Sequence, residues 1–268
     1  MAAPVVVVQG ASRGLGLEFC KQLLKWKTPA VVIATCRHPD ACQELQALAA
    51  RGPGTGSGTL SLLQLDVDRE DDVRGAAERV AARFGGVDLM INCSAMLHPS
   101  GRGETSLRNV SAQGVMATVS TNTVGPLLMA KYFSPLLMKG GGAFGAQPPE
   151  RSRQHRGLLV NMTARVGSIG DNALGGWYSY RLSKAALNMV TKTLSVELGR
   201  SSHNKVVCVS LHPGTVATDL SAPYHRGVPA DRLFSPQHSV ALLLALIQTL
   251  SMEHTGGAYS WDGAPIPW

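Results

Sequence analysis

Short runs of β-branched and other apolar residues alternate along the chain with longer segments in which apolar residues recur at helical spacing. The short runs contain few polar residues, as strands of a parallel sheet do when helices cover both of its faces. A helix between two such strands returns the chain to the same end of the sheet, so that the next strand can run parallel to the previous one. The alternation therefore predicts an α/β fold, with a doubly wound parallel sheet between two layers of helices. The predicted strands are residues 5–9, 30–35, 60–65, 87–92, 158–162 and 206–211 with a short edge strand at 257–260, and the predicted helices are 15–26, 40–50, 70–84, 112–138, 177–199 and 236–250.

The 268 residues contain no internal repeat and no second set of core segments, which predicts a single domain spanning residues 1–268. Three connections rich in glycine or proline interrupt the alternation. Residues 52–58 form a glycine-rich connector, and residues 139–157 are interpreted as a flexible surface insertion. Residues 214–235 follow the sixth strand, at the end of the sheet where doubly wound folds bind their ligands, and we expect them to form a substrate loop.

The composition indicates in which cellular compartment the chain is expected. The most apolar stretch, residues 241–250, is too short to cross a bilayer, and the apolar run that starts at Val5 leaves no space for a separate signal sequence. The five cysteines are odd in number and lack the spacing of metal ligands. They predict reduced thiols in a cytoplasmic protein that has no metal site and no membrane partner.

The formal net charge of +7 is compatible with a nucleic-acid ligand. The densest group of basic residues is Arg151, Arg153, His155 and Arg156, and this group carries no aromatic side chain on which a base could stack. We interpret it as part of a solvated loop and expect no nucleic-acid partner.

A glycine-rich turn follows the first predicted strand and opens the first predicted helix. Glycines there permit a tight turn and let backbone N–H groups approach a diphosphate at the N-terminus of a helix. The position between a buried strand and an amphipathic helix makes the turn a specific indication of a dinucleotide site. The residues predicted to form this site are Gly10, Ser12, Arg13, Gly14, Leu15 and Gly16.

The end of the second strand indicates which dinucleotide binds. An NAD site places a carboxylate there for the ribose 2′-hydroxyl, whereas an NADP site needs a cation for the 2′-phosphate. The strand ends at Thr35 and Cys36 and is followed by Arg37, and Arg13 lies inside the glycine-rich turn. Two cations without a carboxylate at this position predict NADP(H).

The spacing Gly10-x-x-x-Gly14-x-Gly16 resembles the glycine motif of the short-chain dehydrogenase/reductase family, whose members have a Rossmann-type fold. Asp66 and Val67, after the third strand, resemble the segment with which the family contacts adenine. Asn92 begins the element that in the family reads Asn-Asn-Ala-Gly. The string at residues 175–188 is most similar to the carbonyl-reductase branch that includes sniffer and the C-factor proteins.

The resemblance continues through the second half of the chain. Asn122 lies on the predicted long helix where the family has a catalytic Asn, and Tyr180-x-x-x-Lys184 resembles the family's pair of catalytic residues. A later segment resembles the one that holds the nicotinamide, and it contains Pro213, Gly214, Val216 and Thr218. The resemblance implies that Tyr180 and Lys184 also contact the cofactor, that Lys184 holds the nicotinamide ribose, and that Asn122 holds a water in the proton path.

Tyr180 and Lys184 are four residues apart on a predicted helix and therefore share a face. A nearby ammonium favours the tyrosinate, so we expect Lys184 to lower the pKa of Tyr180 from about 10 toward neutral pH. Tyr180 could then give a proton to a substrate carbonyl oxygen as hydride arrives from the nicotinamide.

Two positions depart from the family pattern. Where the family ends its fifth strand with Asn-Ile-Ser-Ser, this chain reads Asn161-Met-Thr163-Ala164, which places Ala164 at the catalytic serine. Thr163 precedes it, and in an extended segment its side chain points to the opposite face. Ser168 carries a hydroxyl four residues further along. Ala95 replaces the final glycine of Asn-Asn-Ala-Gly, which is costly if that backbone has a positive φ or lies close to the cofactor.

The sequence leaves two functions open. One is NADPH-dependent reduction of a small carbonyl compound (an aldehyde, ketone or quinone), slowed by the lost hydroxyl, since one preorganised donor is worth about 10²–10³ in rate. The alternative is a non-catalytic NADP(H)-binding protein that regulates a partner. Ala164 and Ala95 favour the alternative, whereas Tyr180, Lys184 and Asn122 favour the enzyme.

The substrate stays open as well. Tyr224 and His225 in the substrate loop are candidate contacts, and Trp177 and Tyr178 fit either a pocket lining or packing at the start of a helix. The family often forms dimers or tetramers through its two long central helices, and the sequence leaves both a monomer and a homodimer open.

Overall fold

Seven parallel strands form one sheet in the order β3-β2-β1-β4-β5-β6-β9. The structure is a computed structural model that describes residues 3–50, 58–150, 154–200 and 205–268. The strands of the sheet are β1 (Val5–Gln9), β2 (Val31–Cys36), β3 (Thr59–Gln64), β4 (Leu89–Asn92), β5 (Gly157–Met162), β6 (Val206–His212) and β9 (Ala258–Ser260). The chain order reverses between β1 and β4, which is the point where ligands bind in folds of this kind. The doubly wound sheet and its edge strand are confirmed.

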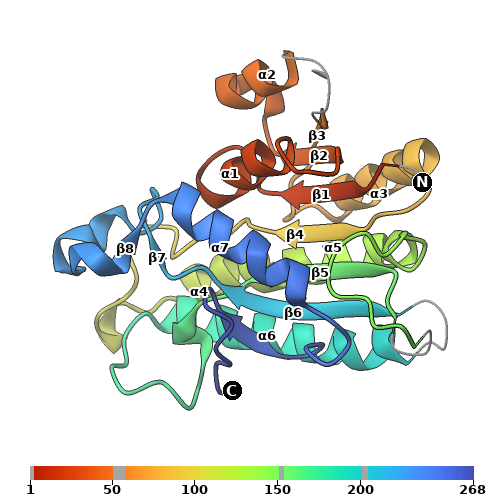
Figure 1. The fold of residues 1–268 in the computed structure, drawn as a ribbon. Coiled ribbons are helices and arrows are strands. Elements are labelled where there is room, and N and C mark those ends of the chain that lie inside the picture. The colour runs from red at the N-terminus through yellow and green to blue at the C-terminus, as the bar shows by residue number, and fades with distance from the viewer. Residues whose placement is uncertain (1–2, 51–57, 151–153, 201–204) are drawn as a thin grey trace.

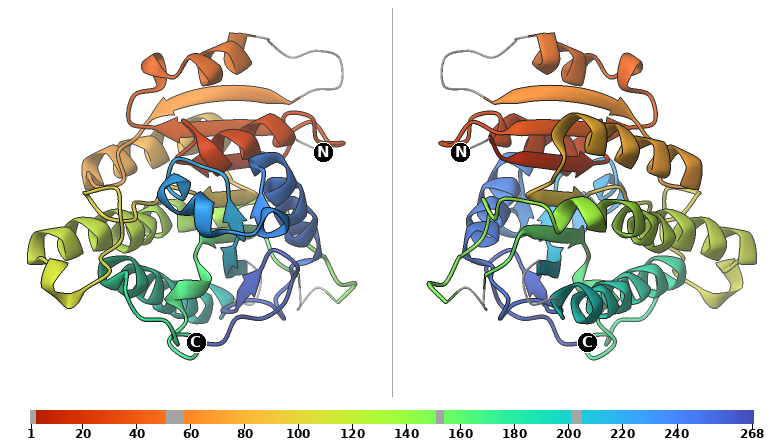
Figure 2. Two further views of the ribbon diagram at one scale, coloured as in Figure 1. Left: turned by 90° about the vertical axis from the view of Figure 1, so that its left-hand side faces the viewer. Right: turned by 90° about the vertical axis from the view of Figure 1, so that its right-hand side faces the viewer.

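Helices cover both faces of the sheet (Figures 1 and 2). The α-helices are α1 (Gly14–Leu23), α2 (Gln43–Ala50), α3 (Glu70–Phe84), α4 (Ala112–Val119), α5 (Gly125–Leu137), α6 (Tyr178–Gly199) and α7 (Pro236–Thr249). Short helical turns are η1 (Pro39–Ala41), η2 (Leu107–Asn109), η3 (Ser120–Val124), η5 (Arg165–Gly167), η6 (Ala222–Gly227) and η7 (Ala230–Arg232).

Alternate residues of each central strand face opposite layers, as the period of two in a strand requires. Val6 and Val8 of β1 pack with α1, α2 and α7, whereas Val5 and Val7 pack with α3, α5 and α6. Side chains from both faces of the central strands are buried in these two clusters, which explains why the strands read as continuous apolar runs. The three-layer arrangement in one α/β domain is therefore confirmed.

The predicted helix at 112–138 is not continuous. It is divided into α4 and α5 by the π-helical turn η3, which contains Asn122. The apolar periodicity runs through the division, so the pattern alone indicates one helix. Turns of this kind are frequent at functional sites.

Residues 214–235 lie beyond the carboxyl ends of the strands, at the left of Figure 1. Two short strands within them, β7 (Thr215–Val216) and β8 (Leu233–Phe234), pair in parallel and close the loop at its base. Ser239 of α7 donates to the carbonyl oxygen of Pro213 at 2.8 Å and fixes the start of the loop.

Residues 139–150 and 154–157 lie at the opposite end of the sheet (Figure 1). Residues 151–153, which carry Arg151 and Arg153, are outside the described residues, as is most of the connector 52–58. The backbone N–H of Gly141 donates to buried Asp88 at 2.7 Å, and Phe144 is buried against Trp26. His155 Nε2 lies 2.9 Å from the carbonyl oxygen of Phe144. The flexibility of this segment stays a prediction.

The C-terminal residues fold back along β9. The N–H of Ile266 donates to the carbonyl oxygen of Ala258, and the N–H of Ser260 donates to that of Ala264, both at 2.8 Å. An antiparallel bridge joins Tyr259 to Pro265. The tail therefore covers the outer side of the edge strand.

Candidate active site

The predicted site residues follow the carboxyl ends of the strands, which a parallel sheet brings to one end. Gly10 follows β1, Arg37 follows β2, and Asn92 ends β4. Ala164 and Pro213 follow β5 and β6. The strand register aligns Gln9 with both Thr35 and Asn92, so the first three positions lie side by side.

The glycine-rich turn has the shape of an anion cradle. Gly10 and Gly14 have φ values of +81° and +56°, which favour glycine, and a Cβ on Gly16 would collide with the carbonyl oxygen of Gly10. Arg13 occupies the N-cap of α1 without a side-chain hydrogen bond, and the first turn contains no acidic residue. The first N–H groups of α1 therefore lack a capping side chain, as a diphosphate site requires.

Arg37 is exposed directly after β2, where a 2′-phosphate would lie. Arg13 is mostly exposed, and its Nε lies 3.6 Å from Oδ2 of Asp219 in the substrate loop. Sequence reasoning missed Asp219, because nothing in the local pattern links residue 219 to the glycine-rich turn.

A buried polar network runs across the end of the sheet. Asn92 Nδ2 donates to Asn161 Oδ1 at 2.8 Å, and Asn161 Nδ2 donates to Thr191 Oγ1 at 2.9 Å. Asn92 Oδ1 is buried without a partner among the described residues. Buried acceptors are nearly always paired, so this atom fits a donor supplied by a bound group.

Asp66 and Val67 lie in the turn between β3 and α3. Asp66 Oδ1 accepts a hydrogen bond from the N–H of Asp68 at 3.1 Å, and Val67 is buried beneath Gly125. At the other end of the site, a Cβ on Gly14 would lie 3.4 Å from Cγ2 of Thr218. The segment from Pro213 to Thr218, with buried Val216, thus lies against the glycine-rich turn.

Tyr180 and Lys184 are both buried on α6, with 7 % and 1 % of their surfaces exposed. The ammonium of Lys184 donates to the carbonyl oxygen of Met162 at 2.8 Å and lies 5.7 Å from the centre of the Tyr180 ring. The shared face predicted from their spacing is present, and the end of β5 holds the lysine.

The predicted fall in the pKa of Tyr180 is wrong for this structure. Burial raises the pKa of the Tyr180 phenol well above its usual value, because the charged form loses its hydration. Burial also lowers the pKa of Lys184 to about 8, although nearby Cys93 opposes that shift. The four-residue spacing predicts that the two groups are close, but it does not predict the desolvation that dominates the pKa shifts of both.

Asn122 is fully buried within η3. Its Nδ2 donates to the carbonyl oxygen of Met96 at 2.7 Å and to Ser183 Oγ at 2.9 Å, and its Oδ1 accepts from the N–H of Met96 at 2.8 Å. Both amide donors are therefore used in joining the loop after β4 to α6. The side chain holds the site together, and its role toward a water stays a prediction.

Ala164 lacks a hydroxyl, and the two neighbouring hydroxyls considered from the sequence, those of Thr163 and Ser168, are both hydrogen-bonded to other residues. Thr163 is buried and donates to Asn188 Oδ1 on α6 at 2.7 Å, while Ala164, on an extended backbone, is only half-buried. Ser168 Oγ accepts from the N–H of Asp171 at 3.1 Å. Ala95 has no positive φ, so that part of its expected cost does not arise.

Sequence reasoning also missed Glu104, which fixes the start of α6. Its buried carboxylate accepts hydrogen bonds from the N–H of Ser179 at 3.2 Å and from the Ser179 hydroxyl. A carboxylate at a helix N-terminus stabilises the unpaired N–H groups there. No motif identifies it, because residues 104 and 179 are 75 apart in sequence.

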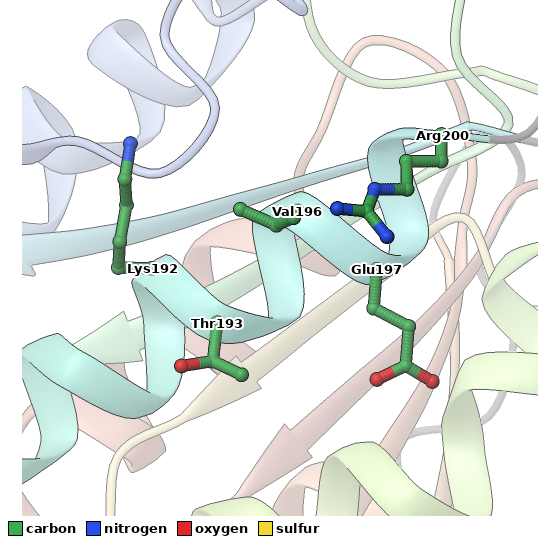
Figure 3. A pocket seen from close by; sticks show the side chains of 5 residues that line it. All are labelled: Lys192, Thr193, Val196, Glu197 and Arg200. Atoms are coloured by element: carbon green, nitrogen blue, oxygen red, sulfur yellow. The ribbon is translucent and has the colours of Figure 1, made fainter.

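A shallow hollow of about 450 Å³ lies on the outer side of α6, lined by Lys192, Thr193, Val196, Glu197 and Arg200 (Figure 3). It begins eight residues beyond Lys184 and includes none of the predicted site residues. The predicted site residues therefore lie apart from this hollow, at and beyond the strand ends.

Within the described ranges, no helix combines the length and apolarity needed to span a membrane. Nor do three His, Cys, Asp or Glu side chains gather there as metal ligands would. All five cysteines are free thiols.

Comparison with known proteins adds three findings. The profile of short chain dehydrogenases matches residues 4–228. The NADPH-bound carbonyl reductase from chicken fatty liver is 31 % identical, with a TM-score of 0.84, and carbonyl reductase Sniffer of D. melanogaster is 30 % identical, with a TM-score of 0.83; both likenesses cover 100 % of each chain. C-signal of Myxococcus xanthus is 32 % identical over 184 residues, which are 69 % of this chain and 94 % of that protein.

Proposed function

The chain belongs to the family of short chain dehydrogenases, and from that premise we propose that it reduces the carbonyl group of an aldehyde, ketone or quinone with NADPH. The observation that carries the proposal is the buried pair of Tyr180 and Lys184 at the end of the sheet that also holds the glycine-rich cradle. Two carbonyl reductases of 30 % and 31 % identity support the choice of reaction, and one of them binds NADPH.

The residues present fit a bound NADP(H). The cradle with its uncapped helix start suits the diphosphate, Arg13 and Arg37 suit the 2′-phosphate, and unpaired Asn92 Oδ1 suits a donor. Asp66 and Val67 would flank the adenine, and the segment from Pro213 to Thr218 would hold the nicotinamide. When bound, NADPH supplies the hydride.

The side chains of this chain supply the proton. The raised pKa of Tyr180 keeps its phenol protonated at neutral pH, which is the form that can donate to a carbonyl oxygen. An ammonium carries three N–H donors, and Lys184 uses one on Met162, which leaves two for a ribose and for the proton path. Its positive charge stabilises the phenoxide that forms as the proton leaves.

A panel of carbonyl compounds tests the proposal directly. The pure protein is mixed with NADPH and an aldehyde, a diketone or a quinone, and the loss of the nicotinamide absorption band is followed. We expect oxidation of NADPH that depends on the carbonyl compound. Tight NADPH binding without oxidation by any compound would contradict the proposal.

A second function is favoured by one specific observation. Ala164 has no hydroxyl, and those of Thr163 and Ser168 are bonded elsewhere. This favours a non-catalytic protein whose NADP(H) occupancy controls a partner. Binding without turnover, together with a conformational change on binding NADPH, would support that alternative.

The proposal extends to assembly and location. Leu182, Met189 and Val196 recur at seven-residue intervals on α6 with 50 %, 65 % and 43 % of their surfaces exposed. Val124 at the end of η3 and Leu127 on α5 are exposed as well. Such a stripe supports a homodimer. The free thiols support a cytoplasmic location. One domain over residues 1–268, with a surface insertion at 139–157 and a substrate loop at 214–235, completes the proposal.

A further inference from the structure

Aromatic rings from separate segments meet beside Tyr180. Trp177 directly precedes α6, and its ring centre lies 6.2 Å from that of Tyr180 in an edge-to-face arrangement. Tyr224 belongs to η6 in the substrate loop, and its ring centre lies 4.7 Å from that of Trp177. The substrate loop and the start of α6 are thus joined through these rings.

Trp177 adopts a backbone conformation that its side chain disfavours. Its φ of +51° is the single positive value among the described residues other than glycine. A left-handed conformation is costly for a residue with a Cβ and persists where the surroundings impose it. The N–H of Trp177 donates to the carbonyl oxygen of Glu104 at 2.6 Å, and Arg181 donates to the carbonyl oxygens of Gly175 and Gly176.

Gly103 positions both rings. A Cβ at this residue would lie 2.6 Å from Cδ1 of Trp177, so the indole can occupy its place because residue 103 has no side chain. The N–H of Gly103 also donates to the hydroxyl oxygen of Tyr224 at 2.9 Å. One backbone position therefore admits the indole and anchors the phenol.

The two rings remain partly open. Tyr180 is 7 % exposed, whereas Trp177 and Tyr224 are each half-buried and keep uncovered surface. The carboxylate of Glu104 is turned toward Ser179 and is already hydrogen-bonded there. Partly uncovered and uncharged aromatic surface therefore lies beside Tyr180.

We propose that Trp177 and Tyr224 are specificity-determining residues that pack against a planar aromatic group attached to the substrate carbonyl. The proposal rests on the proposed function for the position of the carbonyl at Tyr180. Aromatic pairs are attracted beyond the effect of buried area, so a flat ring gains more here than a saturated ring of similar size.

The test compares two substrates that differ in one ring, 1-phenyl-1,2-propanedione and 1-cyclohexyl-1,2-propanedione. The wild-type protein and Trp177→Gly are compared, because glycine accepts the positive φ and removes the indole alone. We expect the ratio of kcat/KM for the phenyl compound to that for the cyclohexyl compound to fall by about tenfold in the variant. Comparing this ratio between the two proteins cancels the difference in intrinsic reactivity between the two compounds.

Gly103→Ala should lower the same ratio by displacing the indole, and Gly75→Ala on α3 is its control, because a Cβ at residue 75 meets no atom closer than 4.0 Å. A purely structural role would slow both substrates equally. Binding of the same two compounds to the protein loaded with NADP⁺, followed by calorimetry, gives a readout that needs no turnover.

The outcomes separate the two proposals. If the phenyl compound binds more tightly than the cyclohexyl compound and this preference is lost in Trp177→Gly, the inference is supported, even when neither compound is reduced. The absence of reduction would overturn the proposed function instead. An unchanged ratio in Trp177→Gly, together with equal binding of both compounds, overturns this inference and leaves carbonyl reduction standing.

Discussion

The glycine-rich turn and the start of α6 obtain their geometry in different ways. The turn is built from consecutive residues, and glycine stands wherever φ is positive, as at Gly10 and Gly14. At the start of α6, Trp177 has a positive φ that is imposed by Glu104 and Gly103, more than 70 residues earlier in the chain. The nucleotide end of the proposed site, residues 10–16, can therefore be predicted from a short stretch of sequence. Its catalytic end, at the start of α6, depends on tertiary contacts.

The largest expected effect falls on the catalytic end. Tyr180→Phe removes the proton donor, and a general acid contributes about 10²–10⁴ in rate, so we expect turnover to fall about 10³-fold. NADPH affinity should change by less than about twofold, because the ring still packs and Lys184 stays bonded to Met162. Steady-state kinetics and a fluorescence titration with NADPH measure the two quantities.

Tyr132→Phe is the matched control, since the Tyr132 hydroxyl donates to exposed Glu70 away from the site. It should retain full activity. Full activity in Tyr180→Phe instead would mean that another group supplies the proton.

The second effect falls on the nucleotide end. Replacing Arg13 and Arg37 together with Ala should reduce the preference for NADPH over NADH by about 10²-fold or more, because each charge-assisted contact is worth about 1.5–3 kcal/mol. Calorimetry with both cofactors measures it. Equal affinity for both cofactors in the wild-type protein would contradict the assignment.

Asp219→Asn sharpens this prediction. The carboxylate lies 3.6 Å from Arg13 and competes with a phosphate for it, so NADPH should bind more tightly in the variant. The gain should be small, about threefold, because exposed ion pairs contribute little.

The third prediction concerns His212, at the end of β6. Burial, and then the charge of Arg165, lowers the pKa of His212 to about 4, and its Nδ1 is buried without a partner among the described residues. The unfolded chain takes up this proton near pH 6.5, whereas the folded protein takes it up near pH 4. Protonation therefore favours the unfolded state, and stability falls as the pH drops from 6.5 to 4.

The loss attributable to His212 should reach at most about 3 kcal/mol near pH 4. Urea unfolding of the wild type and of His212→Gln at pH 7 and pH 4.5 measures it, with exposed His38→Gln as the control. An identical acid sensitivity in the wild type and His212→Gln would rule out this group as the cause.

The last prediction tests the missing hydroxyl. Ala164→Ser should raise turnover about tenfold, because a donor aimed at the developing alkoxide acts on the chemical step. NADPH affinity should stay the same. Kinetics with a diketone or quinone measure the change.

Thr163→Ala is the control for this variant. Thr163 donates to Asn188 on α6, so its loss should lower stability without abolishing chemistry. If Thr163→Ala abolishes activity and Ala164→Ser gains nothing, Thr163 already serves as the missing donor. If neither variant has activity, the non-catalytic function becomes the better explanation.

The same contrast explains what could be predicted from sequence. The strands, the turn and the direction of Thr163 follow from periods of two and from glycine spacing, which are local properties. The turn η3 does not interrupt the apolar periodicity of the helices around it, and β7 and β8 are only two residues long. The periodicity of the sequence therefore predicts none of these three elements. The raised pKa of Tyr180 arises from packing that no spacing encodes.

The tail that folds back on β9 has a consequence for how the protein behaves in concentrated solution. An uncovered sheet edge offers a row of N–H and C=O groups to which a strand of another molecule can add. At β9 the chain's own residues 264–266 occupy that row, which leaves β3 as the edge strand without a strand on its outer side in the described sheet. Edge-to-edge aggregation should therefore begin at β3, at the edge of the sheet opposite β9.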